Sequence, residues 1–289
     1  QAVAKNLSFT KASQELFVSQ PAITKHIQEL EAAYQTRLFD RQGSRISLTD
    51  SGKLLLEHCE RILEDYKRLE YEMHLLHNEY TGGLKLGAST TIAQYVLPPL
   101  LASFIGKFPQ VNLSLLNGNS REIEAALQEH RIDLGFVEGV FRLPNIKYTT
   151  FLEDELVAVV RTGSRLTVGE EITPEELLHL PLVLRERGSG TLDVFERALQ
   201  QHNIKLSSLQ VLMYLGSTES IKLFLEHTDC LGIVSIRSII RELYSGQLRV
   251  VEIKGMPMLR DFSFAQPQGQ ESGLAQVFMQ FAMHNNNKL

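Results

Sequence analysis

The apolar positions near the start of the chain recur with helical spacing. Ile23, Ile27 and Leu30 fall four and three residues apart, which predicts an amphipathic helix whose apolar stripe faces a small core. A shorter helix is predicted before it, with Ala12 and Leu16 on its inner face. Two short helices separated by a turn are typical of a helix-turn-helix motif.

The opposite face of the second predicted helix carries mostly amide, hydroxyl and ammonium groups. Such groups hydrogen-bond to base edges and phosphates, whereas a merely solvated helix more often carries Glu and Lys pairs. An ordinary solvated face is the alternative. The helix start is well marked, because a serine stands at the N-cap and a proline lies in the first turn. We expect contacts with double-stranded DNA from Ser19, Gln20, Pro21, Thr24, Lys25 and Gln28.

A short polar hairpin is predicted after this helix. Leu38 and Phe39 are expected to complete the small core, and residues 41–49 then turn around Gly43. This hairpin is expected to act as a wing. Arg45, near its tip, either reaches a phosphate or the minor groove or stays a solvated loop arginine. The DNA-binding domain is therefore predicted over residues 1–49, and its first helix is expected to be truncated because the chain begins inside it.

From residue 50 the apolar positions follow a heptad. Spacings of four and three alternate through Leu55, Cys59, Ile62, Tyr66, Leu69, Met73, Leu76 and Tyr80. A seam of about 25 residues exceeds what the surface helix of one domain needs, so we predict a coiled-coil linker helix over 50–81 that pairs two chains through residues 50–80. The alternative is a single helix that lies on its own core. Thr81-Gly82-Gly83 is predicted to be a flexible linker.

Beyond residue 83, short apolar strands alternate with amphipathic helices. Strands are expected near 84–88, 111–116, 133–137, 155–160, 182–184, 211–215, 231–234, 248–253 and 262–265. Helices are expected at 91–107, at 121–129, from about 191 and 217, and at 272–284. This alternation predicts an α/β fold with a mostly parallel sheet. The strand at 155–160 is expected to cross into a second lobe, so residues 82–289 would form one lobe from 84–158 and 262–289 and another from 159–261.

Composition and charge narrow the classes of function. The 289 residues are 43% hydrophobic and 22% charged, a soluble globular balance with room for two or three domains. No segment approaches 18 consecutive apolar residues, so no membrane span is expected. The net charge is −5, yet residues 1–48 hold six Lys or Arg against four acids, about +2, which leaves about −7 for the rest. The positive end is the end with the predicted DNA-binding motif.

The two cysteines carry no metal-binding pattern. Cys59 and Cys230 lie far apart and lack a CxxC or CxxH neighbour, so we expect two buried thiols in a reducing cytoplasm and no metal site. The sequence also shows no Ser/His/Asp order, no GxGxxG after a strand and no GxxxxGK[ST] loop. Catalytic residues and a cofactor are therefore not expected.

Three predicted strand-to-helix turns share one chemistry. Each places small hydroxyl residues and free backbone N–H groups at a helix N-terminus, where the helix dipole favours an anion. Ligands of open α/β sheets bind at the carboxyl ends of strands, so the turns are expected to converge on one cleft for a carboxylate or an inorganic oxyanion. Taken singly, each turn is explained better by helix capping, and it is the three turns together that favour a site. The residues are Ser89, Thr90, Thr91, Gly188, Ser189, Gly190, Thr191, Ser217 and Thr218.

Charged residues stand beside these turns. Arg187 precedes the second turn and is expected to pair with the anion, while Arg185 equally suits a structural ion pair. Glu138 ends the third predicted strand of this region, and we expect it either to bind an amine or to gate the hinge.

The residue strings of the first half identify a family resemblance. SQPAITKHIQELE, followed by RLFDR and ISLTDSG, resembles the winged helix-turn-helix of LysR-type transcriptional regulators nearly position by position. The two predicted lobes resemble the periplasmic-binding-type effector domain of that family. VEG at 137–139, RERGSGT at 185–191 and GSTESIK at 216–222 resemble a branch that includes regulators of sulfur assimilation and related anion metabolism.

The resemblance implies a cytoplasmic DNA-binding regulator with a small effector, for which a sulfur oxyanion is the first hypothesis. It also implies a homodimer, a tetramer formed through the effector domains, and contact with the transcription machinery. One departure is visible, because Tyr34-Gln35 stands where the family usually has Leu-Gly. The competing hypothesis is a two-lobed small-anion binding protein or enzyme in which the N-terminal helices serve only assembly.

Overall fold

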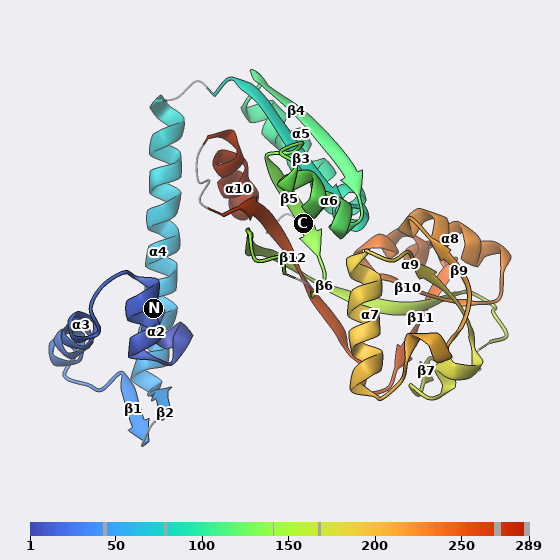
Figure 1. Ribbon diagram of the computed structural model, residues 1–289, viewed down its shortest axis with the longest axis horizontal. Helices are drawn as coiled ribbons and strands as arrows, with labels where there is room; N and C mark the ends of the chain where they lie inside the picture. Colours follow the sequence, from blue (N-terminus) through green and yellow to red (C-terminus); the bar gives the residue numbers. More distant parts are fainter. Residues whose placement is uncertain (43–44, 78–79, 141, 167–168, 269–272, 286–289) are drawn as a thin grey trace. The chain divides into compact units, whose positions relative to one another are not determined.

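The structure is a computed structural model of the chain (Figure 1). It describes residues 1–289 except 43–44, 78–79, 141, 167–168, 269–272 and 286–289, and it describes the backbone alone at 41, 42, 45, 64, 67, 68 and 70–77. The chain divides into two compact units, Gln1–Asn78 and Glu79–Leu289.

The first unit contains short helices and a hairpin followed by one long helix. Its small core contains the buried side chains of Val3, Phe9, Ala12 and Ile23, and Phe39 packs edge-on against Phe9 with ring centroids 5.9 Å apart. The predicted hairpin is confirmed, because the two strands pair antiparallel from Phe39↔Leu48 to Gln42↔Arg45. The elements are α1 (Ala2–Asn6), α2 (Phe9–Glu15), α3 (Gln20–Ala33), β1 (Phe39–Gln42), β2 (Arg45–Leu48) and α4 (Asp50–His77).

Two predicted core positions of this unit are wrong. Leu16 is 50% exposed because α2 ends at Glu15 and the chain then turns through Phe17, whose φ of 54° lies in the left-handed region. Leu30 is 40% exposed, since the core formed by α1 and α2 reaches only the first turns of α3. Periodicity identified the helices correctly, but the length of the stripe that is covered depends on the neighbours.

Helix α4 contains 28 residues, which corresponds to roughly 42 Å. Several of its large apolar side chains are exposed in the single chain. Ile62 is 66% exposed, and Tyr66 and Leu69 are also more than half exposed. The side chains of Met73 and Leu76 lie outside the described part of the seam. The predicted linker glycines, Gly82 and Gly83, are strand residues instead, because they pair with Val111 and Asn112 at the start of β3.

The second unit consists of two α/β lobes. Lobe I contains β3 (Gly82–Ser89), η1 (Ile92–Val96), α5 (Leu97–Lys107), β4 (Val111–Gly118), α6 (Ser120–Gln128), β5 (Leu134–Glu138) and α10 (Leu274–Asn285). Lobe II contains β7 (Glu171–Ile172), η2 (Glu176–His179), β8 (Pro181–Arg185), α7 (Gly190–Gln201), η3 (Leu206–Ser208), β9 (Gln210–Leu215), α8 (Thr218–His227), β10 (Leu231–Ser235), η4 (Ile236–Ser238), α9 (Ile240–Ser245) and β11 (Leu248–Ile253). The prediction of two α/β lobes is confirmed.

Two long strands join the lobes. β6 (Ile146–Arg161) and β12 (Met258–Pro267) pair with each other and run from one lobe into the other (Figure 1). The sheet order is β4-β3-β5-β12-β6-β10-β8-β9. β3, β4 and β5 are parallel, as are β8, β9 and β10, whereas both crossing strands pair antiparallel with their neighbours. The prediction of a mostly parallel sheet is therefore right inside each lobe and wrong at the crossing, because the chain goes out along β6 and returns along β12.

Each lobe has its own buried apolar cluster. One contains Ile123, Leu127 and Val137 of lobe I, and another contains Leu184, Phe195 and Ile233 of lobe II. Since the crossing strands connect two separate cores, the relative position of the lobes depends on contacts at their junction. No helix among the described residues is long and apolar enough to cross a membrane.

The turn after α3 contains a residue in a left-handed backbone conformation, at the position where the sequence departs from the expected glycine. Gln35 stands there with φ of 51°, a left-handed conformation that strains a side chain with a Cβ. We predict that Gln35→Gly stabilises the first unit by about 0.5–1 kcal/mol, measured by urea-dependent hydrogen exchange of the α3 amides. Gln14→Gly inside α2 is the matched control and should destabilise by about 1 kcal/mol. Equal effects of the two substitutions would contradict the assignment of strain to Gln35.

Candidate functional site

The polar face of α3 is open to solvent. Gln20, Lys25 and Gln28 are exposed, and the hydroxyl of Thr24 donates to the carbonyl of Gln20 at 3.1 Å. Ser19 occupies the N-cap by its backbone conformation, but its hydroxyl makes no capping hydrogen bond. That hydroxyl therefore remains available to a phosphate, whereas Pro21 has no N–H and the amide of Ala22 donates to the carbonyl of Ser19 at 3.1 Å.

Charges on α3 are partly paired along the helix. Lys25 and His26 both approach Glu29, at 3.8 Å and 3.3 Å. These pairs are exposed and weak, and they leave the ammonium free to exchange Glu29 for a phosphate. The backbone of Arg45 begins β2, whereas its side chain lies outside the described residues.

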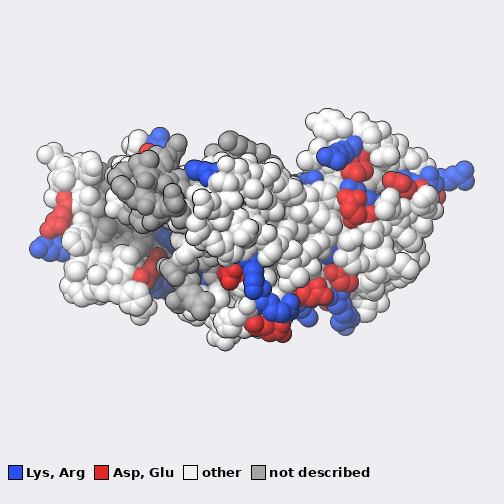
Figure 2. All heavy atoms as spheres, turned by 90° about the horizontal axis from the view of Figure 1, so that it is seen from above, with Lys and Arg blue, Asp and Glu red and all other residues white. Residues whose placement is uncertain are grey.

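On the face of the second unit shown in Figure 2, basic and acidic side chains lie side by side. This face therefore presents no broad basic surface of the kind that binds DNA without sequence preference.

Two of the three predicted turns meet at one buried guanidinium. Arg185, the last residue of β8, is 1% exposed and donates to the hydroxyls of Thr90 at 3.3 Å and Thr218 at 3.4 Å. It also donates to the carbonyl of Gly216 at 3.4 Å and forms a close ion pair with Glu186 at 2.8 Å. Arg185 thus links the first turn in lobe I with the third turn in lobe II.

A second buried cluster links the first and second turns. Glu138 Oε1 accepts from the hydroxyls of Thr91 and Thr191, both at 3.4 Å, and pairs with Arg260 Nη1 at 3.1 Å. Arg260 Nη1 also donates to Thr191 at 3.0 Å, and its Nε donates to Asp154 at 2.7 Å. Thr191 belongs to lobe II and Glu138 to lobe I, so this network also spans the junction.

The backbones of the two lobes approach closely at the second turn. A Cβ on Gly190 would lie 2.3 Å from the carbonyl oxygen of Glu138, and the amide of Arg121 donates to the carbonyl of Gly188 at 3.3 Å. Only a residue without a side chain fits at Gly190 in this arrangement. The glycine therefore allows the helix N-terminus of lobe II to contact the end of β5.

Three buried polar atoms of this region have no hydrogen-bond partner among the described residues. They are Ser89 Oγ, Glu138 Oε2 and Arg260 Nη2, on side chains that are almost completely buried. A buried polar group without a partner costs about 1–3 kcal/mol, so such groups indicate a site that binds a further molecule. The atoms without partners therefore include a hydrogen-bond donor, Arg260 Nη2, and an acceptor, Glu138 Oε2.

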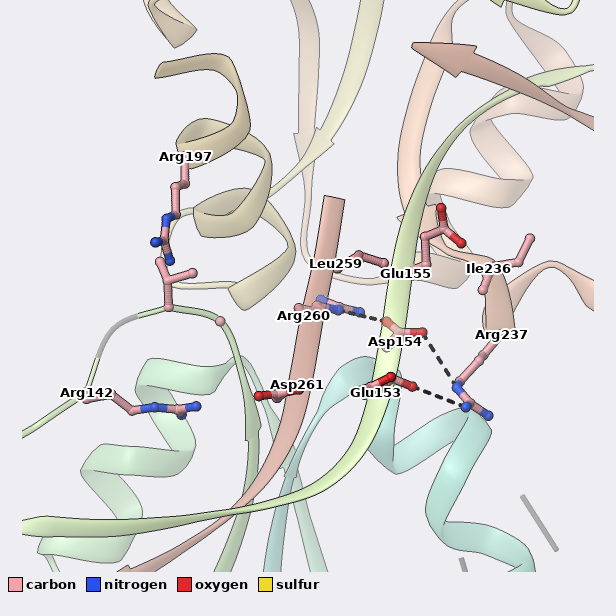
Figure 3. Close-up of a pocket in the computed structure, with 12 residues that line it drawn as sticks. Arg142, Glu153, Asp154, Glu155, Arg197, Ile236, Arg237, Leu259, Arg260 and Asp261 are labelled. Carbon is pink, nitrogen blue, oxygen red and sulfur yellow. Dashed lines mark hydrogen bonds and ion pairs between the residues drawn. The ribbon is translucent and has the colours of Figure 1, made fainter. Parts of the chain in front are cut away.

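A cavity of about 750 Å³ lies beside the crossing strands (Figure 3). Arg142 and Arg197 stand on one side of it and Arg237 on the other, with Asp154 and Arg260 between them (Figure 3). The guanidinium of Arg142 is held over the ring of Tyr148 at 4.4 Å. Burial and the hydrogen bond to Glu124 raise the pKa of Tyr148 to about 12. The cavity is lined by none of the predicted turn residues, but it touches their network through Arg260 and Asp154.

The remaining predicted residues have more local roles. Ser189 and Ser217 cap α7 and α8, accepting from Leu192 N at 3.2 Å and Ser220 N at 3.1 Å. Arg187 is exposed, whereas Arg185 points into the cluster of turns and also makes the structural ion pair that was its alternative role. The carboxylate of Glu138 lies at the junction of the lobes, where it contacts two hydroxyls and a guanidinium.

Sequence reasoning missed Arg260 and Asp154. Their only signal was a charged residue within otherwise apolar strand sequence, and such residues also occur on exposed strand faces. The structure shows that both are buried where β6 and β12 pass between the lobes. Within the described part of the chain, no group of three or more His, Cys, Asp or Glu side chains is placed to hold a metal ion.

The geometry defines a winged helix-turn-helix protein with a two-lobed ligand-binding domain, and comparisons agree. Residues 1–53 match the model of the bacterial regulatory helix-turn-helix protein, lysR family, and residues 77–286 match the LysR substrate binding domain. The chain belongs to the LysR family of DNA-binding transcriptional regulators.

Individual relatives cover most of the chain. The HTH-type transcriptional regulator YeiE of Escherichia coli strain K12 is 35% identical over 87% of this chain and 83% of its own length. The regulatory domain of CcmR from Synechocystis PCC6803, solved in complex with 2-PG, is 27% identical with a TM-score of 0.64 and covers 71% of this chain and 97% of that domain. CrgA from Neisseria meningitidis shares the fold, with a TM-score of 0.74 at 19% identity over 98% of this chain and 95% of its own.

Removal of Arg260 should leave the buried carboxylate of Glu138 without its ion-pair partner and leave Asp154 with only the longer pair to Arg237 at 3.7 Å. We predict that Arg260→Met destabilises the second unit by about 3–5 kcal/mol, measured by urea unfolding of the full chain. The control Arg197→Met, at an exposed arginine, should change stability by less than about 0.5 kcal/mol. A small effect of Arg260→Met would show that Asp154 and Glu138 do not depend on this guanidinium.

Proposed function

We propose that this LysR-family regulator reads DNA with the polar face of α3 and senses a small anion at the junction of its two lobes. The observation that carries the sensing role is the convergence of all three helix-start turns on Arg185 and on the Glu138–Arg260 pair. Helix N-termini and guanidinium groups both favour an anion, and the buried donors without partners supply further hydrogen bonds.

The DNA-binding face proposed here comprises the exposed side chains of α3 and the wing. Gln20 and Gln28 present amides suited to base edges, while Ser19 and Lys25 suit phosphates. Pro21 and Thr24 shape the start of the same face, and Arg45 of the wing is proposed to reach the backbone or the minor groove. Six or so side chains specify few base pairs, so a second copy is needed for a full site.

The exposed apolar surfaces support pairing of chains. Exposed Ile62, Tyr66 and Leu69 form part of the apolar seam on α4, which a second α4 would cover. Exposed Leu212, Met213 and Tyr214 on the edge strand β9, together with Leu115 and Leu116 on β4, offer a further surface for association between effector domains. We propose a homodimer through residues 50–80 and a tetramer through these domains.

The class of effector follows from the buried atoms without partners. Arg260 Nη2 is a donor and requires an acceptor on the ligand, whereas Glu138 Oε2 is an acceptor and requires a donor on the ligand. A fully deprotonated oxyanion offers only acceptors and would face the Glu138 carboxylate. The atoms therefore favour an anion that also carries a hydroxyl, an amine or an acidic proton. A protonated sulfur oxyanion fits this description, and so does a hydroxycarboxylate.

The proposed mechanism couples the ligand to DNA through lobe position. An anion held by turns from both lobes stabilises their closed arrangement, and closure changes how the effector domains of neighbouring chains pack. The changed packing alters the spacing of the DNA-binding domains, the bend of bound DNA and the surface offered to the transcription machinery. The 2-PG complex of the CcmR regulatory domain supports a small ligand for a domain of this type.

Substitutions on α3 test the DNA-binding face. Gln28→Ala should lower affinity for the cognate half-site by about 1–3 kcal/mol, because a base-edge contact is lost. Lys25→Ala should weaken binding to all sequences and reduce the slope of affinity against salt by about one counterion. Titrations of full-length protein onto labelled DNA measure both, with exposed Gln128→Ala on α6 as the control. Normal binding by both α3 variants would reject the assigned face.

A panel of anions tests the effector site. Sulfate, sulfite, thiosulfate, glycolate and 2-PG are compared by thermal shift, and a ligand at 100 times its Kd should stabilise the full chain by about 2.7 kcal/mol. Glu138→Gln replaces one carboxylate acceptor by an amide donor. We expect the Kd for glycolate divided by the Kd for sulfate to rise at least about tenfold, because the variant favours sulfate. No stabilisation by any of the five anions would remove the support for this site.

A further inference from the structure

We propose that Tyr95, Glu219 and Lys222 form an interlobe latch that positions the first and third turns of the effector site against each other. Its role in sensing rests on the proposed function, whereas the latch itself is testable without a ligand. Tyr95 follows the first turn on η1 of lobe I. Glu219 and Lys222 follow the third turn on α8 of lobe II.

The three side chains make direct contacts across the junction. The hydroxyl of Tyr95 donates to Glu219 Oε1, and Lys222 Nζ donates to the same oxygen at 2.8 Å. The ammonium lies 5.2 Å from the centroid of the Tyr95 ring and 3.5 Å from its hydroxyl oxygen. One carboxylate oxygen therefore accepts from one donor in each lobe.

The lobe II half of the latch is fixed within its own lobe. Lys222 is buried, and its ammonium also donates to the carbonyl of Ser238 at 3.0 Å and pairs with Glu242 at 2.8 Å. One cation thus lies between two carboxylates, and its position does not depend on Tyr95. Loss of the Tyr95 hydroxyl should free lobe I without disordering the ammonium.

The lobe I half stands on an unusual helical segment. Residues 92–96 form a π-helix, and Pro98 and Pro99 follow in the first turn of α5. A π-turn holds one more residue than an α-turn, which changes the direction of the side chains it carries, and such turns are frequent at functional sites. The segment places Tyr95 against α8 only four residues after Thr91.

Polar contacts, more than tight packing, hold the latch. Tyr95 and Lys222 border a cavity of about 610 Å³, so one side of the latch is not filled by protein. Burial and the hydrogen bond to Glu219 raise the pKa of the Tyr95 phenol above its ordinary value. Burial opposes ionisation of Glu219, but the hydrogen bonds from Lys222 and Tyr95 outweigh it and lower the pKa of Glu219. Arg185 and Glu242 are the other charges that act on Tyr95, and Arg241 is the other charge that acts on Glu219.

Hydrogen exchange in the ligand-free full chain tests the latch. Tyr95→Phe keeps the ring and removes only the hydroxyl, so we expect amides of residues 217–223 in lobe II to exchange about tenfold faster. The control is Tyr244→Phe, at a tyrosine that is 91% exposed, and it should leave these amides unchanged. Glu219→Gln should mimic Tyr95→Phe, and the double variant should exchange no faster than either single variant.

The outcomes separate the latch from the effector site. The latch would be overturned by faster exchange confined to residues 92–99 in Tyr95→Phe, or by additive effects in the double variant. Either result would show that the contact is only a local structural one. If Tyr95→Phe loosens lobe II but none of the five anions stabilises the wild-type chain, the latch stands and the proposed effector function fails. If the anions stabilise the wild-type chain while exchange in lobe II is unchanged by Tyr95→Phe, the effector site stands and the latch fails.

Discussion

The burial of the Arg260 charge is the constraint on which the effector domain depends. A guanidinium that is 1% exposed requires compensation, and Asp154 and Glu138 supply it from β6 and β5 at 2.7 Å and 3.1 Å. Because β12 carries Arg260 between the lobes, this compensation fixes where the crossing strands lie. The carboxylate of Glu138 in turn receives the hydroxyls of Thr91 and Thr191, so helix starts from both lobes are drawn to the same point.

A regulator benefits from keeping its polar contacts at such a junction. The apolar clusters of the two lobes are separate, so movement of one lobe breaks hydrogen bonds and ion pairs without opening either core. Interactions of this kind are worth a few kcal/mol, whereas disruption of a packed core would cost far more. Arg185 belongs to this set, because its guanidinium touches the first and third turns.

Local sequence predicted much of the fold and part of the site. The helix-turn-helix, the wing hairpin and most strands of both lobes follow from period and turn residues, since these are properties of neighbouring positions. The exposure of Leu16 and Leu30 did not follow, because burial depends on which other helix covers a stripe. Arg185 and Arg187 looked alike in sequence, yet Arg185 ends β8 and meets turns of both lobes, whereas Arg187 lies in the loop beyond the strand and is exposed.

The sequence by itself determined the family, the order of the elements and the three hydroxyl-rich helix starts, since each is written in contiguous residues. Only the tertiary structure decided which charges meet. Asp154 and Arg260 are 106 positions apart, and Tyr95 and Glu219 are 124 positions apart, so no local pattern relates them. The physical reason is that β6 and β12 cross between two cores, which brings side chains from distant segments into a junction where buried charges must find partners.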